Sequence, residues 1–222
     1  MKEASLTLYV VDDDEALRRS LMLLLFSQGL PIQSFDSGEA FLQTVDLAQP
    51  GCVIMDLRLG GVSGLEVLER LRIARCPLVT LFLSGHGDIP TALEAVRHGA
   101  YDWVVKPDTQ QLLTKLPLAL DEARRRSTAL HRWTELTPRE REVAHLVGLG
   151  QANKEIARLL TPPCSPRSVE THRANIFSKL DVANDNELGR WLAAHPWLSR
   201  TERSQDDAPS PHQPGPPGTN PD

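Results

Sequence analysis

Five polar side chains at four places in the first half of the chain have the chemistry of a phosphorylation site, provided that the fold brings them together. They are Asp12, Asp13, Asp56, Ser84 and Lys106. Each place ends or follows a short apolar run; these runs are Leu6–Val11, Cys52–Met55, Leu78–Leu83 and Trp103–Val105. Three carboxylates, a hydroxyl and an amine at one place suit a divalent cation and a phosphoryl group.

The segments between the apolar runs have helical patterns, so the runs are predicted to be parallel strands joined by crossover helices. Helices are expected at Glu15–Gln28, Gly38–Val45, Gly64–Ala74, from Asp88 to Gly99, and from Thr109 towards Ala129 with an interruption or kink near Pro117. With Ile32–Phe35 as a further strand, the sequence predicts an α/β fold with a five-stranded parallel sheet and helices on both faces. All strand C-termini then open on one edge, where ligands bind.

Composition limits the class of protein. The chain has 222 residues, of which 41% are hydrophobic, so it can form one large domain or two small ones. It has no apolar stretch of the ~20 residues that a membrane helix needs and no secretory signal at its N-terminus. Its three cysteines are widely spaced, as expected of a reduced, cytoplasmic protein.

Charge divides the chain into two parts. Residues 1–120 carry 10 basic and 15 acidic side chains, whereas residues 121–200 carry 13 and 10. We predict a first domain at 1–120, a linker helix at 121–133, a second domain at 134–199 and a disordered tail at 200–222, where Pro, Ser, Gly, Asp and Gln dominate. A basic second domain is able to approach nucleic acid.

Each candidate residue also has a purely structural interpretation. The acidic pair is also typical of a helix N-terminus, Asp56 of a turn, Ser84 of a helix entry, and Lys106 of a solvated lysine. Four such coincidences at four strand ends favour a shared site instead. Three clustered carboxylates would also repel one another without a cation.

Four sequence segments resemble the receiver domain of response regulators. They are VVDDDEALRRSL (Val10–Leu21), VIMDLRLGGVSGLEVLERL (Val53–Leu71), LFLSGHGD (Leu81–Asp88) and GAYDWVVKP (Gly99–Pro107). The whole chain is similar to the NarL/FixJ class. The resemblance implies that Asp56 accepts a phosphoryl group from a sensor histidine kinase, and that Mg²⁺ is held by Asp12, Asp13, Asp56 and the backbone carbonyl of Arg58.

The resemblance also implies a switch. The family's Ser or Thr at the position of Ser84 moves to bond the phosphoryl group, and an aromatic residue at the position of Trp103 then turns inward. A Trp packed permanently under the fourth helix is the alternative. Gly60 and Asp108 depart from the Pro and Phe that are common there, and His86 lies where family members tune phosphoryl lifetime.

The second half of the chain predicts a compact helical unit. ELTPREREVAHLV (Glu135–Val147) begins with Thr137 as N-cap and Glu140 three residues later, a capping box. GQANKEIARLL (Gly150–Leu160) and SPRSVETHRANIFSKL (Ser165–Leu180) form a helix pair that resembles the LuxR-type helix-turn-helix domain. The turn Thr161–Cys164 is about two residues longer than the family usually has and contains two prolines.

In such a domain the second helix of the pair lies in the DNA major groove. The predicted DNA-contacting residues are Lys154, Arg167, Thr171, Arg173, Ala174, Ser178 and Lys179. Lys154, Arg173 and Lys179 suit phosphate contacts, which position the protein without specifying sequence. The alternative is a solvated polar face on a small helical protein.

The sequence thus predicts a non-enzymatic, DNA-binding two-component regulator. Phosphorylation of Asp56 is expected to drive formation of a homodimer that binds promoter DNA, with RNA polymerase as a further partner. Two alternatives stay open: a phosphorylation-independent DNA-binding protein whose receiver only assembles, and a Mg²⁺-dependent phosphatase acting in trans through Asp56. Phosphodonor labelling followed by intact-mass measurement distinguishes these three.

Overall fold

A five-stranded parallel sheet organises the first half of the molecule. The computed structural model describes residues 6–85, 89–106 and 108–198. The strands are β1 (Thr7–Val11), β2 (Ile32–Phe35), β3 (Gly51–Met55), β4 (Val79–Ser84) and β5 (Asp102–Val105), in the order β2-β1-β3-β4-β5. Each pairs in parallel with its neighbours, and β3 and β4 are buried along their whole length. The predicted fold class is confirmed.

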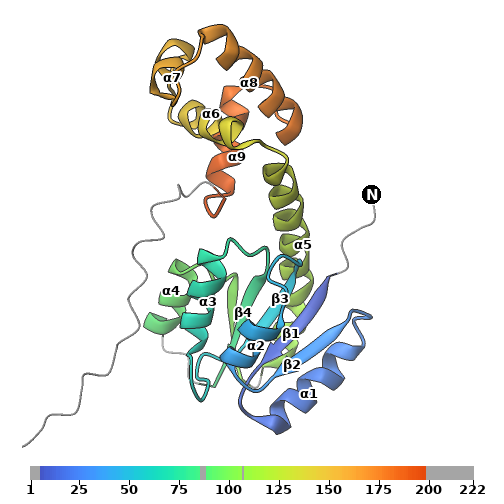
Figure 1. Ribbon diagram of the computed structural model, residues 1–222. Coiled ribbons are helices and arrows are strands. Elements are labelled where there is room, and N and C mark those ends of the chain that lie inside the picture. Colours follow the sequence, from blue (N-terminus) through green and yellow to red (C-terminus); the bar gives the residue numbers. More distant parts are fainter. Residues whose placement is uncertain (1–5, 86–88, 107, 199–222) are drawn as a thin grey trace, which may run out of the picture.

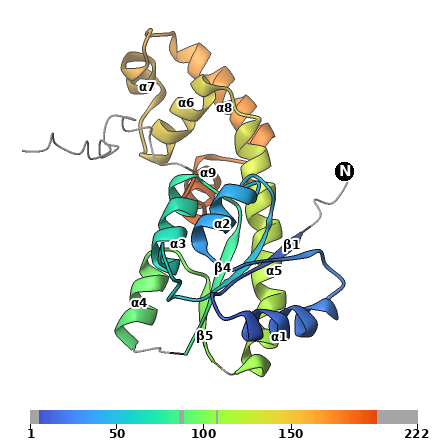
Figure 2. The ribbon, with the colours of Figure 1, turned by 60° about the horizontal axis from the view of Figure 1, so that its bottom comes forward.

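Helices cover both faces of the sheet, as Figures 1 and 2 show. They are α1 (Glu15–Phe26), α2 (Gly38–Thr44), α3 (Gly64–Ile73), α4 (Ile89–Arg97) and α5 (Thr109–Thr134). One apolar core includes Leu21 and Leu25 of α1 and Leu112 and Leu116 of α5. The other lies beneath α2, α3 and α4 and includes Phe41, Val67 and Ala95. This two-sided burial explains the nearly continuous apolar runs of the central strands.

Local sequence signals set several helix boundaries. Asp14 caps α1 by accepting hydrogen bonds from the N–H groups of Ala16 and Leu17, and Ser37 caps α2 in the same way. Gly29, which directly follows the expected first helix Glu15–Gln28, has a left-handed φ of +67°. His86 and Asp88, the expected start of the fourth helix, lie outside the described residues, as do Pro107 and the predicted tail.

The expected interruption at Pro117 is wrong, because α5 is one helix of 26 residues. Pro117 lies on the exposed side of α5, where water can hydrate the carbonyl group that proline leaves without its helical partner. The predicted linker residues 121–133 form the C-terminal half of this helix. Figure 1 shows α5 running from the sheet to the C-terminal helices.

The C-terminal unit consists of α6 (Pro138–Gly148), α7 (Asn153–Leu159), α8 (Pro166–Leu180) and α9 (Asp185–Ala194). The predicted capping box of α6 is present, since Thr137 and Glu140 exchange hydrogen bonds. Trp133 of α5 packs into the core of this unit with Val143, Ile156 and Ile176. Arg132 of α5 also donates to the carbonyl oxygen of Leu180, at 3.0 Å. The end of α5 is therefore part of the C-terminal unit.

No helix in the described part of the chain combines the length and the apolar character that crossing a bilayer requires.

Candidate functional site

The ends of three strands bring together the acidic residues and the lysine that the sequence singled out. Asp12 and Asp13 directly follow β1, Asp56 follows β3, and Lys106 follows β5. Each of the three aspartates offers an oxygen that lies within 4.8 Å of those of the other two. Three converging carboxylates are a donor set that fits a hard divalent cation such as Mg²⁺.

Lys106 bridges two of these carboxylates. Its Nζ lies 2.6 Å from Oδ2 of Asp12 and 2.7 Å from Oδ2 of Asp56. Burial lowers the pKa of Lys106, but the hydrogen bonds and charges of Asp12 and Asp56 outweigh burial, so its pKa is raised. Burial raises the pKa of Asp12, and the hydrogen bond from Lys106 opposes this only in part.

The three aspartates differ in access. Asp12 is 2% exposed, and its other oxygen, Oδ1, accepts a hydrogen bond from the N–H of Asp14 at 2.9 Å. Asp13 is exposed, and Asp56 is half-buried. The N–H of Arg58 donates to Oδ1 of Asp56 at 3.3 Å. The carbonyl oxygen of Arg58 stays a predicted ligand of Mg²⁺.

Two residues that shape the loop after Asp56 were missed in the sequence. Gly64 lies so close to the carbonyl oxygen of Asp56 that an added Cβ would collide with it and would lie 2.8 Å from Cε1 of Phe82. Glu39 of α2 accepts a hydrogen bond from the N–H of Val62 at 2.8 Å, across 23 residues. Gly64 directly follows the capping residue Ser63, and this position in the sequence could have indicated its importance. No nearby residue in the sequence indicates the role of Glu39.

The two predicted switch residues lie inside the receiver. Ser84, at the end of β4, is 2% exposed. Trp103 is 9% exposed, with its ring centroid 5.6 Å from that of Phe82, and it packs in the same core as Ala92 and Ala95 of α4. The tryptophan ring is therefore buried in this structure, and its role as a switch residue stays a prediction.

The exposed face of α8 is smaller than the sequence suggested. Four of the predicted DNA-contacting residues on α8 are exposed: Arg167, Thr171, Ala174 and Ser178. Lys154 of α7 is exposed as well. Arg173 is instead half-buried, forms an ion pair with Asp185 and donates to Oδ1 of Asn153 at 2.8 Å. Lys179 lies 2.6 Å from Oε2 of Glu140, whose side chain is 3% exposed. Both cations therefore also join helices of the C-terminal unit, and their role as phosphate contacts stays a prediction.

The long turn between α7 and α8 is fixed to α6. Arg139 donates through Nη1 to the carbonyl oxygen of Thr161 at 3.2 Å, and through Nη2 to that of Pro162. The N–H of Cys164 also bonds to the carbonyl oxygen of Ala157, at 3.1 Å. These contacts hold the extra residues at the surface, outside the C-terminal core.

A carboxylate site on a parallel sheet, joined by one helix to a helix-turn-helix unit, agrees with two family models. Residues 8–117 match the response regulator receiver domain, and residues 134–192 match the luxR family of bacterial regulatory proteins. The chain therefore belongs to the NarL/FixJ class of response regulators. It is a DNA-binding two-component regulator of transcription.

Individual relatives extend the likeness to nearly the whole chain. The transcriptional regulatory protein FixJ of Bradyrhizobium diazoefficiens is 38% identical over 192 residues, which cover 82% of this chain and 92% of that protein. The tetrathionate response regulatory protein TtrR of Salmonella typhimurium is 36% identical over 188 residues, covering 83% and 90%. Full-length FixJ from B. japonicum has a similar solved structure, with a TM-score of 0.50, 35% identity and coverage of 86% of this chain and 97% of that one.

Proposed function

We propose that Asp56 is the phosphoacceptor of this regulator and that Lys106 neutralises charge beside it. The bridge from Lys106 to Asp12 and Asp56 is the observation that carries this proposal. A positive group fixed between two carboxylates at a strand edge is arranged to stabilise the charge of a transferring phosphoryl group.

Access favours Asp56 over the other two aspartates as the nucleophile. The side chain of Asp12 is only 3% exposed, whereas that of Asp56 is 12% exposed. Asp13 is exposed, and Lys106 does not bond to it. Asp56 combines partial exposure with contact to the lysine, so it can reach an incoming phosphoryl group while its charge is balanced.

The reaction is a transfer between two nucleophiles. A carboxylate oxygen of Asp56 attacks the phosphorus of a phosphohistidine on a sensor kinase, and an O–P bond forms. The N–P bond breaks, and its electron pair returns to the imidazole. Mg²⁺ would be held by Asp12, Asp13, Asp56 and the carbonyl oxygen of Arg58, and it would supply positive charge that balances the charge of the phosphoryl group. Lys106 supplies the remaining charge.

The output that we propose joins the two units. Ser84 bonds the phosphoryl group, the receiver surface near α4 and β5 changes, and two receivers pair. A homodimer then presents two copies of α8 to promoter half-sites, with RNA polymerase as a further partner in the cytoplasm. The exposed residues Lys154, Arg167 and Thr171 are suited to contact DNA. The functional units in this proposal are residues 1–120, 121–133 and 134–199.

Phosphodonor labelling tests the acceptor. The protein is incubated with acetyl phosphate and Mg²⁺, and its intact mass is measured. Wild type should gain one labile phosphate and Asp56→Asn none, because Asn keeps the shape but lacks the nucleophilic oxygen. Asp36→Asn is the matched control, since Asp36 follows β2 on the same sheet edge but lies outside the carboxylate cluster. Labelling of Asp56→Asn at the wild-type level would overturn the proposal.

Sedimentation tests the coupling to dimerisation. A sample treated with beryllofluoride should sediment as a dimer and an untreated one as a monomer, because the modification must favour one of two surface states. The same oligomeric state in both samples would favour the receiver that only assembles. Release of phosphate from a second phosphorylated protein would favour the phosphatase alternative.

A further inference from the structure

A cavity of about 440 Å³ lies between the receiver and the segment that follows α9. Its walls come from the C-terminal ends of α3 and α4, the start of β4, the middle of α5, and the residues around Trp197. The start of β4 is at the sheet edge opposite to Asp56, because the carboxylate cluster lies at the C-terminal ends of the strands. The cavity is therefore separate from the phosphorylation site.

The lining combines apolar surface with positive charge. Leu68, Leu71 and Trp197 contribute apolar side chains. Four arginines, two of which are Arg72 and Arg126, line the cavity, against one glutamate among the described lining residues. Its volume is within the range of ~300–1,000 Å³ that is typical of small-molecule pockets.

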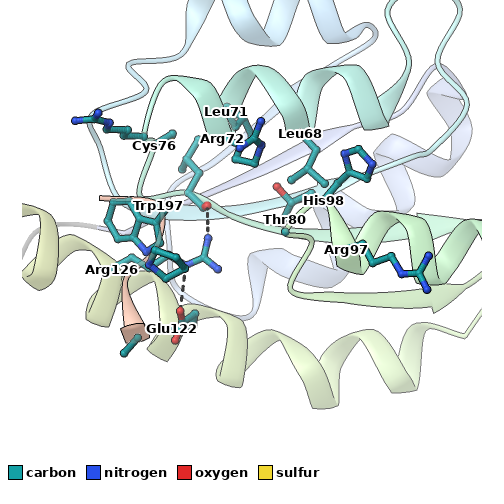
Figure 3. A pocket seen from close by; sticks show the side chains of 15 residues that line it. Leu68, Leu71, Arg72, Cys76, Thr80, Arg97, His98, Glu122, Arg126 and Trp197 are labelled. Atoms are coloured by element: carbon teal, nitrogen blue, oxygen red, sulfur yellow. Dashed lines mark hydrogen bonds and ion pairs between the residues drawn. The ribbon is translucent and has the colours of Figure 1, made fainter. Parts of the chain in front are cut away.

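Two polar groups in this cavity have hydrogen-bond donors that are free to bind a ligand. Thr80 is 1% exposed, and its Oγ1 has no hydrogen-bond partner within the described part of the chain. Arg126 donates through Nε to Glu122, at 3.0 Å, and through Nη1 to the carbonyl oxygen of Leu78, at 3.3 Å; its Nη2 has no protein acceptor among the residues described. In the view of Figure 3 the Arg126 guanidinium group lies between Trp197 and Thr80.

Helix electrostatics explain only part of this charge. Arginines at the C-terminal ends of α3 and α4 are expected there, because cations interact favourably with the helix dipole. Arg126 lies eight residues before the end of α5, and Thr80 lies on a strand. A buried hydroxyl without a partner costs about 1–3 kcal/mol. Because Thr80 and Arg126 line the same cavity, one bound acceptor is able to serve both groups.

We propose that this cavity binds a small organic carboxylate with an apolar body. The carboxylate accepts hydrogen bonds from Nη2 of Arg126 and Oγ1 of Thr80, and the apolar part packs against Leu68, Leu71 and Trp197. The ligand touches the receiver and the segment after α9 together. Binding therefore stabilises the contact between the two units, independently of phosphorylation.

Calorimetric titration of the full-length protein with naphthalene-2-carboxylate tests the proposal, with the neutral 2-naphthalenemethanol as comparator and no phosphodonor present. The carboxylate should bind at least about tenfold more tightly than the alcohol, because a hydrogen bond to a charged group is the stronger one. Thr80→Val should weaken carboxylate binding about tenfold while leaving the melting temperature unchanged or higher, since it removes an unpartnered hydroxyl.

Arg126→Met should also lose carboxylate binding, whereas Arg125→Met should keep it. Arg125 is the matched control because it pairs with the same Glu122 but is 65% exposed and does not line the cavity. Equal affinity for the carboxylate and the alcohol, equal losses in the two arginine variants, or no binding at millimolar concentration would overturn the proposal. None of these outcomes bears on Asp56, because no phosphodonor is used.

Discussion

The ion pair between Lys179 and Glu140 gives a sharp test of how the C-terminal unit is held together. Glu140 is buried, and it accepts hydrogen bonds from the N–H and the hydroxyl of Thr137 at 2.8 and 3.1 Å as well as from Lys179. Lys179→Met keeps most of the side-chain volume but removes the cation. The carboxylate of Glu140 would then be buried beside Thr137 without an opposite charge.

The expected loss of stability in Lys179→Met lies between the values known for buried and for exposed ion pairs. Removing one partner of a fully buried pair costs about 3–5 kcal/mol, and exposed pairs contribute about 0–1 kcal/mol. Because Lys179 is 31% exposed and Glu140 only 3%, we expect a loss of roughly 2 kcal/mol at neutral pH. That loss corresponds to about thirtyfold faster hydrogen exchange of protected amides.

The pH dependence identifies the cause. Burial raises the pKa of Glu140, but Lys179 and Thr137 outweigh burial and lower it. A lowered pKa stabilises the folded state above the ordinary value of about 4.3, and this contribution is lost as the pH falls through the lowered pKa. In Lys179→Met the part of that contribution due to Lys179 is missing. The stability difference between variant and wild type should therefore shrink as the pH falls below about 4.3.

Hydrogen exchange of α6 and α8 in the full-length protein, at neutral pH and at about pH 3, measures both effects. Lys154→Met is the control, because Lys154 is exposed. It should leave exchange unchanged and lower the salt slope of DNA binding by about 0.9, the value for one phosphate contact. Unchanged exchange in Lys179→Met, or a loss of the same size at both pH values, would refute the reasoning.

Three further predictions concern local packing and reactivity. Gly64→Ala should lower the free energy of unfolding by about 1–3 kcal/mol and slow phosphodonor labelling, because the added Cβ meets the Asp56 carbonyl oxygen; urea unfolding at wild-type stability would contradict this. Ala152→Ser should raise the stability of the C-terminal unit by about 1 kcal/mol, because α7 has no side-chain cap; calorimetry checks the shift. A thiol reagent should modify Cys164 first, because burial raises the pKa of Cys52 to about 12 and that of Cys76 to about 11. Equally rapid modification of all three cysteines would show that these two are accessible.

Local patterns in the sequence predicted the elements well. The strand Ile32–Phe35 was predicted at its observed bounds, and the capping box of Thr137 and Glu140 was recognised from a spacing of three residues. Such signals are local, because capping and apolar periodicity depend on neighbours within one or two helical turns. The common edge for Asp12, Asp56 and Lys106 follows in turn from the parallel sheet.

Contacts between distant residues were not predictable in this way. Lys179 and Glu140 are 39 residues apart, and Arg173 and Asn153 are 20 apart. No spacing rule says which of several basic residues on a helix will pair inside the protein and which will remain exposed. Pro117 shows the opposite error: a local rule predicted an interruption, but the proline lies on the exposed side of a helix that tertiary packing supports.

Because α5 is one unbroken helix, the number of residues in the linker sets the rotation of the C-terminal unit relative to the receiver as well as the distance between them. Arg126 bonds to Leu78 of the receiver, and Arg132 bonds to Leu180 of the C-terminal unit, so the two attachments are less than two turns apart. Each residue inserted between them would turn one unit relative to the other by about 100° and move it by about 1.5 Å. Seven inserted residues nearly restore the original orientation, to within about 20°, whereas one or two place α8 on another side of the receiver. Chimeric regulators with exchanged receivers would therefore need junctions spaced by whole heptads.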